Sequence, residues 1–392
     1  MKVLFDHQAF TMQTHGGVSR CFAELYCNLP LDVQASYSIH ETDNVYAREI
    51  GIGVPRGYDY EHFVFPFHFP FKSRLFAAYN SLMNGFEFQS TNNSYFYGDV
   101  YQKKYSIELI KKKQYEIFHP TFFDDYFLQF IGSKPFVLTI HDMISWIYSN
   151  ENNDNWKWQV EKMKILAPKA SAIIAVSENT KKDIIKYLKI PEDKIYVIYH
   201  GCSFPKVKNP LRIISPSYIL YVGDRGFYKN FEFFIRDVAP ILKKHEDLYV
   251  VCTGKPFSVK ELQQFDIFEI KDRFVHYWVA NDGELYSLYH NAVCFVYPSE
   301  YEGFGIPILE AYQADCPVLL NNASCFPEIA GDAAIYFNMT KDNTDFANQF
   351  ELLYGMSSSE RSALLVKQRK RLNKYSWKQS ALKLVDVYNS IL

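Results

Sequence analysis

Short apolar runs, separated by turns and amphipathic stretches, recur along the whole chain. Runs of this length without strict polar–apolar alternation are typical of strands in a parallel sheet that is buried on both faces. The stretches between them are long enough for helices, which together indicate an α/β protein. The predicted strands lie at residues 3–5, 136–143, 172–176, 195–198, 217–222, 248–254, 275–277, 292–296, 317–320 and 333–337.

The alternation breaks between residues 204 and 216, where three prolines occur without any period. Such a stretch is typical of a linker. A chain of 392 residues is long enough for two domains. We therefore expect a first Rossmann-like domain at residues 1–205, a second at 206–375, and a final amphipathic helix at 376–392.

The composition is that of a soluble globular chain, with 48% hydrophobic and 22% charged residues. A net charge of −2 gives no general reason to expect a nucleic-acid partner. The seven cysteines lack C-x-x-C spacing, which favours reduced thiols in a cytoplasmic protein. The first six residues turn polar too soon for a signal peptide, and no apolar run reaches the roughly 20 residues of a membrane span.

The most informative stretch follows the predicted strand at 292–296. Residues 297–310 read Y-P-S-E-Y-E-G-F-G-I-P-I-L-E. Gly303 and Gly305 allow a tight turn and a close approach of a ligand to the backbone, and Pro307 suits the first turn of a helix. We therefore expect a strand, a glycine loop and a helix in that order.

Two carboxylates flank this predicted helix start. Glu302 lies in the loop, and Glu310 lies roughly one turn, or about 5 Å, along the helix. The helix N-terminus between them is a natural seat for phosphate. The arrangement indicates a ligand with phosphates in the middle and hydroxyl groups on both sides, such as a nucleotide sugar. The alternative is a plain junction in which the glutamates only favour the helix dipole.

A histidine and an aspartate lie at the carboxyl end of the predicted strand at residues 136–143. Ligands of open α/β sheets bind at the carboxyl ends of strands, so His141 and Asp142 are candidates for a binding site. A histidine at this position can also be a capping or core residue, and the sequence leaves that alternative open.

A second glycine turn follows the predicted strand at residues 217–222. Gly223 is followed by Arg225 and Lys229, two cations four residues apart beside a predicted helix start. Such a pair can grip a diphosphate. A solvated basic turn is the alternative.

A third glycine turn, at Gly16 and Gly17, follows the first predicted strand and runs into an amphipathic helix that ends near residue 30. This is the first unit of a Rossmann-like half, although the G-x-G-x-x-G spacing of dinucleotide-binding proteins is missing. A plain turn is the alternative.

The E-G-F-G-I-P-x-x-E text at residues 302–310 resembles the signature of retaining glycosyltransferases of family 4. The texts H-P-T-F-F at 119–123, T-I-H-D-M at 139–143 and E-I-A-G-D at 328–332 are similar to that family as well. The resemblance covers nearly the whole chain and is weakest from about 35 to 110. It implies the GT-B fold, in which two Rossmann-like domains face a central cleft and a C-terminal helix crosses back to the first domain.

The resemblance also implies roles for the candidate residues. In the family, the second glutamate of the motif holds the nucleotide ribose, the first lies by the donor sugar, and the histidine of the H-D pair reaches that sugar. The loop with two glycines approaches the donor phosphates and the acceptor. The implied donor-binding residues are Gly16, Gly17, Gly223, Arg225, Lys229, Glu302, Gly303, Phe304, Gly305 and Glu310.

Four of the candidate residues are expected to act in catalysis: His141, Glu302, Arg225 and Lys229. Many relatives carry Arg-Lys-Asn where this chain has Tyr-Lys-Asn at residues 228–230, a departure that bears on Arg225 and leaves Lys229 in place. Preorganised positive charge would stabilise the departing diphosphate. Because no D-x-D triplet is present, neither a metal nor a cofactor is expected.

The implied reaction is transfer of a hexose from a nucleotide sugar to a glycan or a lipid-linked glycan, with retention of anomeric configuration. The wording of the motifs most resembles bacterial O-antigen and capsule enzymes, so GDP-mannose is the expected donor. A nucleotide-sugar epimerase of the same two-domain shape is the alternative. A non-catalytic binder of nucleotide sugars is a further one.

An aromatic and basic stretch at residues 58–76 includes two prolines that forbid a long helix. Its rings, with Lys72 and Arg74, suit weak peripheral contact with the inner membrane face. The alternative, which we favour from the sequence, is a loop packed against its own domain.

Overall fold

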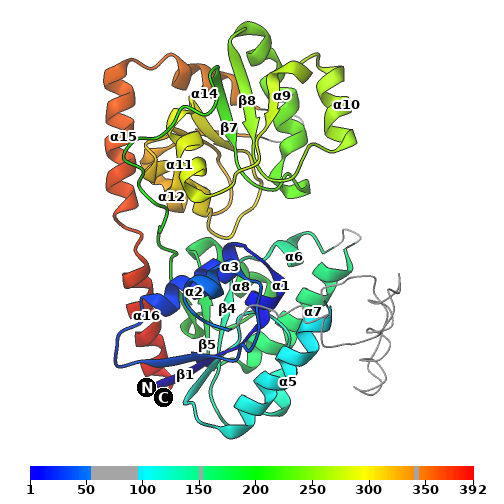
Figure 1. Cartoon of the computed structure of the whole chain (residues 1–392), viewed down its shortest axis with the longest axis vertical. Coiled ribbons are helices and arrows are strands. Elements are labelled where there is room, and N and C mark those ends of the chain that lie inside the picture. The colour runs from blue at the N-terminus through cyan, green and yellow to red at the C-terminus, as the bar shows by residue number, and fades with distance from the viewer. Residues whose placement is uncertain (54–95, 150–152, 340–343) are drawn as a thin grey trace, which may run out of the picture. The chain divides into compact units, whose positions relative to one another are not determined.

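The computed structural model of the chain describes residues 1–53, 96–149, 153–339 and 344–392 (Figure 1). The stretch at residues 58–76, including Lys72 and Arg74, therefore lies outside the described residues. Its contact with a membrane stays a prediction.

Twelve strands are described, and every pairing recorded between them is parallel. The strands are β1 (Lys2–Phe5), β2 (Gln34–Tyr37), β3 (Ile117–His119), β4 (Val137–Ile140), β5 (Ala172–Ala175), β6 (Ile195–Val197), β7 (Ser217–Tyr221), β8 (Leu248–Cys252), β9 (Phe274–His276), β10 (Cys294–Tyr297), β11 (Val318–Asn321) and β12 (Ile335–Phe337). The predicted α/β class is thereby confirmed.

The helices fill the connections, as parallel pairing requires. They are α1 (Gln8–Met12), α2 (Gly17–Cys27), α3 (Val45–Glu49), α5 (Phe96–Lys112), α6 (Ile144–Ile147), α7 (Asp154–Lys169), α8 (Glu178–Leu188), α9 (Phe231–Lys244), α10 (Val259–Ile267), α11 (Asp282–Asn291), α12 (Ile306–Gln313), α13 (Phe326–Ala330), α14 (Phe346–Tyr354), α15 (Ser358–Leu372) and α16 (Trp377–Ser390). Short 3-10 turns are η1 (Tyr126–Gln129), η2 (Glu192–Lys194), η3 (Phe227–Lys229), η4 (Lys271–Arg273) and η5 (Gly331–Ala333).

The strands form three sheets, in the orders β2-β1-β3, β4-β5-β6 and β12-β11-β10-β7-β8-β9. By its contacts the chain divides into two compact units. The first comprises residues 1–139, 168–172 and 388–392, and the second comprises residues 140–167 and 173–387. The domain boundaries expected from the sequence stay predictions.

In the first unit, a buried histidine ties β3 to the end of the chain. The ring of His119 is fully buried, with Nδ1 bonded to the hydroxyl of Tyr388 at 2.6 Å and Nε2 bonded to that of Thr139 at 2.8 Å. Two polar contacts on one buried imidazole fix the orientation of its ring. The last turn of α16 is thus fixed to β3 of this unit.

In the second unit, the six-stranded sheet is buried on both faces because its strands alternate between two cores. Leu220, Phe295 and Val318 pack with α11 and α12, whereas their neighbours Ile219 and Val296 pack with α9 and α14. Figure 1 shows α9 and α10 on one side of β7 and β8 and α11 and α12 on the other.

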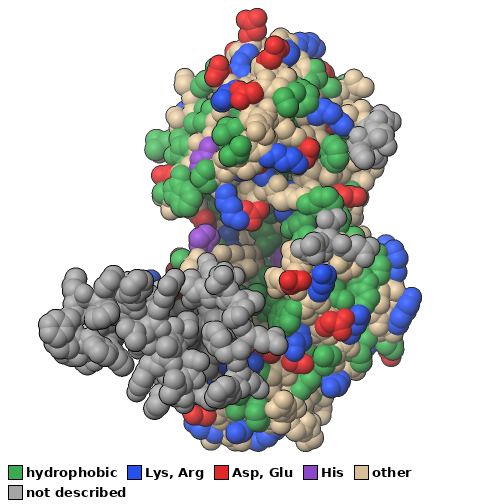
Figure 2. All heavy atoms as spheres, turned by 90° about the vertical axis from the view of Figure 1, so that its right-hand side faces the viewer, with side chains coloured by type: hydrophobic (Ala, Val, Ile, Leu, Met, Phe, Trp, Pro, Cys, Tyr) green, Lys and Arg blue, Asp and Glu red, His purple; other side chains and the backbone are tan. Residues whose placement is uncertain are grey.

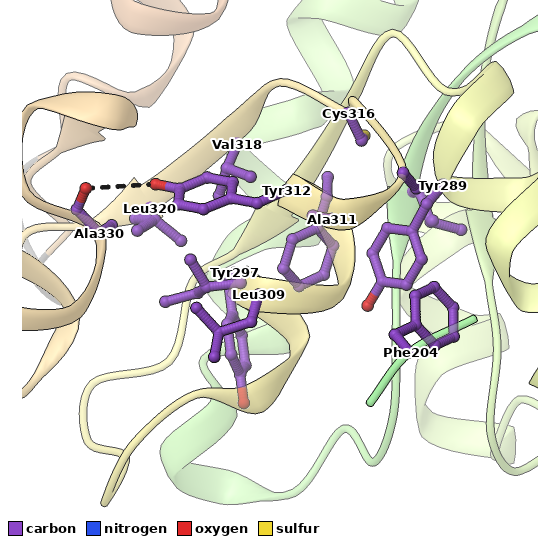
Figure 3. Packing of buried hydrophobic residues seen from close by; sticks show 14 of the residues in the cluster. Phe204, Tyr289, Tyr297, Leu309, Ala311, Tyr312, Cys316, Val318, Leu320 and Ala330 are labelled. Atoms are coloured by element: carbon purple, nitrogen blue, oxygen red, sulfur yellow. Dashed lines mark hydrogen bonds between the residues drawn. The ribbon is translucent and has the colours of Figure 1, made fainter. Parts of the chain in front are cut away.

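Tyrosines in the core under α12 are held by the packing of their rings and by hydrogen bonds of their hydroxyl groups. Figure 3 shows the Tyr312 hydroxyl pointing to the carbonyl oxygen of Ala330, to which it donates a bond of 3.3 Å, while the Tyr289 ring lies beside Phe204. Because a buried hydroxyl needs a partner, these bonds fix the rotation of the helix on the sheet. Glu310, which follows Leu309 on α12, is positioned by this packing.

Candidate active site

The loop between β10 and α12 passes directly against the end of β4. A Cβ atom on Gly303 would overlap with the carbonyl oxygen of His141, so a glycine is required there. The carbonyl oxygen of Gly303 accepts bonds from the hydroxyls of Ser177 at 2.7 Å and Thr180 at 3.3 Å, at the start of α8. The loop is therefore fixed at one point by two segments of the second unit, the end of β4 and the start of α8.

The helix start expected from the sequence is confirmed. Gly305 caps α12 with a left-handed φ of +88°, Pro307 lies in the first turn, and Glu310 lies within the helix. The side chain of Glu310 is buried, and the hydroxyl of the buried Tyr289 donates to its Oε2 at 3.3 Å. Its carboxylate is thus held at a defined position on α12.

Glu302 forms an ion pair with Lys229. The Nζ atom of Lys229 lies 2.5 Å from Oε1 of Glu302, and the two side chains are only 15% and 10% exposed. Water screens such a pair less than it screens a pair on the surface. The structure therefore brings together two of the four residues that the sequence assigned to catalysis.

The backbone of Glu302 is held as firmly as its side chain. The hydroxyl of Ser324 donates to the carbonyl oxygen of Glu302 at 2.6 Å and accepts from its amide at 3.1 Å. Ser324 makes this double contact from a left-handed conformation with a φ of +53°. A non-glycine residue in that region is strained, and such strain occurs mainly at functional sites.

Two buried asparagines support the segment before Glu302. Asn230, also left-handed with a φ of +54°, donates from Nδ2 to the carbonyl oxygen of Pro298 at 3.2 Å. Asn321 donates from Nδ2 to the carbonyl oxygen of Ser299 at 3.2 Å. Because Asn230 directly follows Lys229, it links the positions of the two members of the ion pair.

Two titratable residues at the end of β4 border this pair. Burial raises the pKa of Asp142 to about 6, and nearby Glu302 adds to the shift while the amide of Ile144 and Lys229 oppose it. Burial lowers the pKa of His141 to about 4, and its ring stacks on that of His200 at 5.8 Å between centroids. His141 is therefore neutral at physiological pH and suited to hydrogen bonding with a hydroxyl group.

Arg225 is engaged away from the ion pair. Its guanidinium lies 2.6 Å from Oε1 of Glu261 and donates to the carbonyl oxygens of Thr253, Lys255 and Pro256 at 3.2, 2.6 and 3.0 Å. Its side chain is 5% exposed. In this structure Arg225 secures the connection from β8 to α10, and its role toward a diphosphate stays a prediction.

The remaining glycines divide between the two units. Gly223 follows β7 with a left-handed φ of +102°, which explains the need for glycine there. Gly16 and Gly17 lie in the first unit, where Gly17 is already the first residue of α2. Their loop is fixed by the Nδ2 atom of Asn44, which donates to the carbonyl oxygen of Gln13 at 2.8 Å.

The sequence alone does not reveal that the site is supported by Ser324, Asn230, Asn321 and Tyr289. Ser324 lies 22 positions beyond Glu302, and nothing in the local text marks the contact. Asn230 carried the only signal, since it belongs to the same Tyr-Lys-Asn text as Lys229.

Two family models match consecutive parts of the chain. "Glycosyltransferase Family 4" matches residues 16–203, and "Glycosyl transferases group 1" matches residues 203–379. The chain belongs to the family 4 glycosyltransferases. The resemblance carried by the E-G-F-G-I-P-x-x-E text is thereby confirmed.

This glycosyltransferase is similar to bacterial mannosyltransferases. The O-antigen chain mannosyltransferase RfbU of Salmonella typhimurium is 28% identical over 204 residues, which cover 51% of this chain and 56% of that protein. The O-antigen chain mannosyltransferase B of Escherichia coli is 24% identical over 266 residues, covering 64% and 69% respectively. The match thus spans little more than half the length of the Salmonella protein.

The solved structures show the fold. Anabaena Alr3699/HepE in complex with UDP and glucose aligns over 100% of both chains with a TM-score of 0.70 and 15% sequence identity. The glycosyltransferase described here thus has the GT-B fold that the sequence predicted. None of the helices in its described ranges is long and apolar enough to cross a membrane.

Replacement of Gly303 tests the contact with β4. Gly303→Ala should lower the free energy of unfolding by about 1–3 kcal/mol, because the added methyl group forces the loop away from His141. Gly226→Ala is the matched control, since a Cβ there meets no atom of the described chain within 4 Å. Urea denaturation measures both, and equal stability of the two variants would contradict the contact.

Acid should destabilise the protein through His141. The unfolded chain takes up a proton near pH 6.5, whereas the folded ring does so only at about 4. The stabilising contribution of a neutral His141 is therefore present above about pH 6.5 and lost as pH falls toward 4. Relative to His141→Asn, the wild type should lose about 1–2 kcal/mol between about pH 6.5 and 5. Denaturation at several pH values measures the free energy of unfolding of both proteins. If this free energy falls in parallel for the wild type and His141→Asn, the prediction is refuted.

Proposed function

We propose that the protein transfers a hexose from a nucleoside diphosphate sugar to a glycan or lipid-linked glycan, with retention of anomeric configuration and with GDP-mannose as donor. The observation that carries the proposal is the buried Lys229–Glu302 pair beside the start of α12, with Glu310 on the same helix. A cation, a helix N-terminus and two separated carboxylates match the diphosphate, the sugar and the ribose of one ligand.

The ion pair indicates how the donor would enter. The ammonium of Lys229 is paired with the carboxylate of Glu302. A diphosphate carries more negative charge than a carboxylate and would compete for that ammonium. Its binding would release the carboxylate of Glu302, which could then accept hydrogen bonds from hydroxyl groups of the donor sugar.

The reaction proposed is substitution on one face of the sugar. The acceptor oxygen forms a bond to the anomeric carbon, the bond from that carbon to the diphosphate oxygen breaks, and a phosphate oxygen takes the acceptor proton. Lys229 and the amides of Gly303, Phe304 and Gly305 would stabilise the leaving diphosphate. Because Ser324 holds the backbone of Glu302, the carboxylate released from Lys229 is suited to orienting the sugar and not to attacking it.

The identities proposed for the donor and the acceptor are inferred from the names of similar proteins. Two of them bear names as O-antigen chain mannosyltransferases, which favours a mannosyl donor and a surface-polysaccharide acceptor. HepE was solved with UDP and glucose, so UDP-glucose is the competing donor. Nothing in the comparisons supports the epimerase alternative, and all of the proteins compared above other than HepE are named as mannosyltransferases.

We further propose that the enzyme acts without a metal or cofactor in the cytoplasm, with weak peripheral contact at the inner membrane face. Lys229 supplies positive charge where a divalent ion would otherwise be needed. Figure 2 shows acidic and basic side chains interspersed over the described part of one face, which supports the expectation that nucleic acid is not a partner.

A thermal-shift screen of nucleotide sugars tests the proposal directly. GDP-mannose should raise the melting temperature more than UDP-glucose does, with or without EDTA. When the donor is incubated with the enzyme but without an acceptor, NMR should show its sugar unchanged, which excludes an epimerase. No shift with any nucleotide sugar would refute the proposal, and a larger shift with UDP-glucose would correct the donor.

Removal of the Lys229 ammonium should weaken donor binding and turnover together. The expected loss for Lys229→Ala is about 2–4 kcal/mol, because the diphosphate loses its nearest cation. Lys255→Ala is the control, since that side chain is 83% exposed. Calorimetry with GDP and GDP-mannose measures binding, and unchanged affinities for Lys229→Ala would remove this residue from the site.

The two carboxylates should differ in the ligand that they recognise. Glu310→Gln should weaken bare GDP, because its partner is the ribose. Glu302→Gln should leave GDP binding equal or tighter, since it releases Lys229, while weakening intact GDP-mannose. Calorimetry with both ligands decides this, and equal losses for both variants would contradict the division of roles.

A further inference from the structure

Four aromatic rings gather beside the Lys229–Glu302 pair. The ring of Tyr148 lies at the centre, with its centroid 5.4 Å from that of Phe227, 5.9 Å from that of Tyr228 and 6.2 Å from that of Trp156. These four residues are called the aromatic platform below. Tyr148 follows α6, Trp156 lies on α7, and the other two belong to η3.

The platform adjoins the ion pair through short contacts. The ammonium of Lys229 lies 5.0 Å from the centroid of the Tyr228 ring. The carbonyl oxygen of Tyr228 accepts a bond of 2.8 Å from the amide of Glu300, and the carboxylate of Glu300 accepts one of 3.2 Å from the hydroxyl of Tyr148. These contacts therefore hold the rings in fixed positions.

The exposure of Phe227 is the feature that the fold does not explain. Its side chain is 64% exposed, whereas the other three rings are partly buried. Isolated exposed apolar residues are ordinary, but this one packs edge-on against Tyr148 within three residues of Lys229. A rigid ring at the border of a site offers contact area at low entropic cost.

We propose that the aromatic platform is the subsite for a sugar ring of the acceptor glycan. The inference rests on the proposed transfer reaction, which requires an acceptor hydroxyl close to Lys229 and Glu302. One face of a pyranose ring consists largely of C–H bonds with partial positive charge, which suit the negative face of an aromatic ring. Glu300 at the edge of the platform supplies a carboxylate for sugar hydroxyls.

The acceptor fits this surface better than the donor or a membrane does. The donor sugar is assigned to the buried side chains of Glu302 and His141, whereas a glycan extending across the surface needs an exposed support. Anionic lipid is disfavoured because the carboxylate of Glu300 adjoins the platform. This carboxylate would repel lipid phosphate.

The experiment uses the full chain saturated with GDP and a panel of methyl pyranosides together with α-mannobiose. Saturation-transfer NMR should show the strongest effect on C–H protons of one ring face. Phe227→Leu, which keeps an apolar side chain without a π face, should weaken the apparent sugar affinity about three- to tenfold. Phe227→Tyr, which keeps the ring, should retain it.

The controls separate this inference from the function proposed above. Ile267→Ala removes an equally exposed apolar residue on α10 and should change nothing. GDP affinity should be the same in all variants. If the wild type binds no GDP-mannose but shows a pyranoside effect that is lost in Phe227→Leu, the donor assignment fails and the subsite stands.

Three outcomes would overturn the subsite. They are the absence of any pyranoside effect in the wild type, an unchanged effect in Phe227→Leu, and binding of anionic vesicles that Phe227→Leu abolishes.

Discussion

The close passage of the Gly303 backbone against the end of β4 is the constraint on which the site depends. Through this one residue the loop after β10 meets the carbonyl oxygen of His141 and the hydroxyls of Ser177 and Thr180. Glu302 precedes the contact and α12 begins directly after it. Because the backbone is fixed at that point, the bonds from Ser324 to Glu302 and from Tyr289 to Glu310 act on residues whose places in the chain are already set.

Two cations of one loop have different environments, although the sequence presents them as a pair. Lys229 faces Glu302, and Arg225 is enclosed by Glu261 and backbone carbonyl oxygens. A buried pair adds little to stability once the cost of removing both charges from water is counted. The Lys229 pair therefore holds an ammonium at a fixed position, and Arg225 orders the connection from β8 to α10.

Local patterns explain what could be predicted from the sequence. The strands, the start of α12, and the places of Glu302 and Glu310 follow from apolar runs and from glycine and proline at fixed offsets. The same patterns missed β2, whose sequence Q-A-S-Y is not an apolar run, and β3, and they placed residues 333 and 334 in the strand β12, which begins only at Ile335. The environment of Arg225 was out of reach for a different reason, since Glu261 lies 36 positions away.

Ser324 shows how stability and function separate at one position. Its left-handed backbone costs roughly 1 kcal/mol that glycine would not, so folding alone would favour glycine there. Two hydrogen bonds between the serine hydroxyl and the backbone of Glu302 offset that cost. A homologue that acquired glycine at this position would keep its fold and lose the clamp. Under the proposed function, sequence drift toward glycine would mark descendants whose chemistry no longer depends on a rigid Glu302.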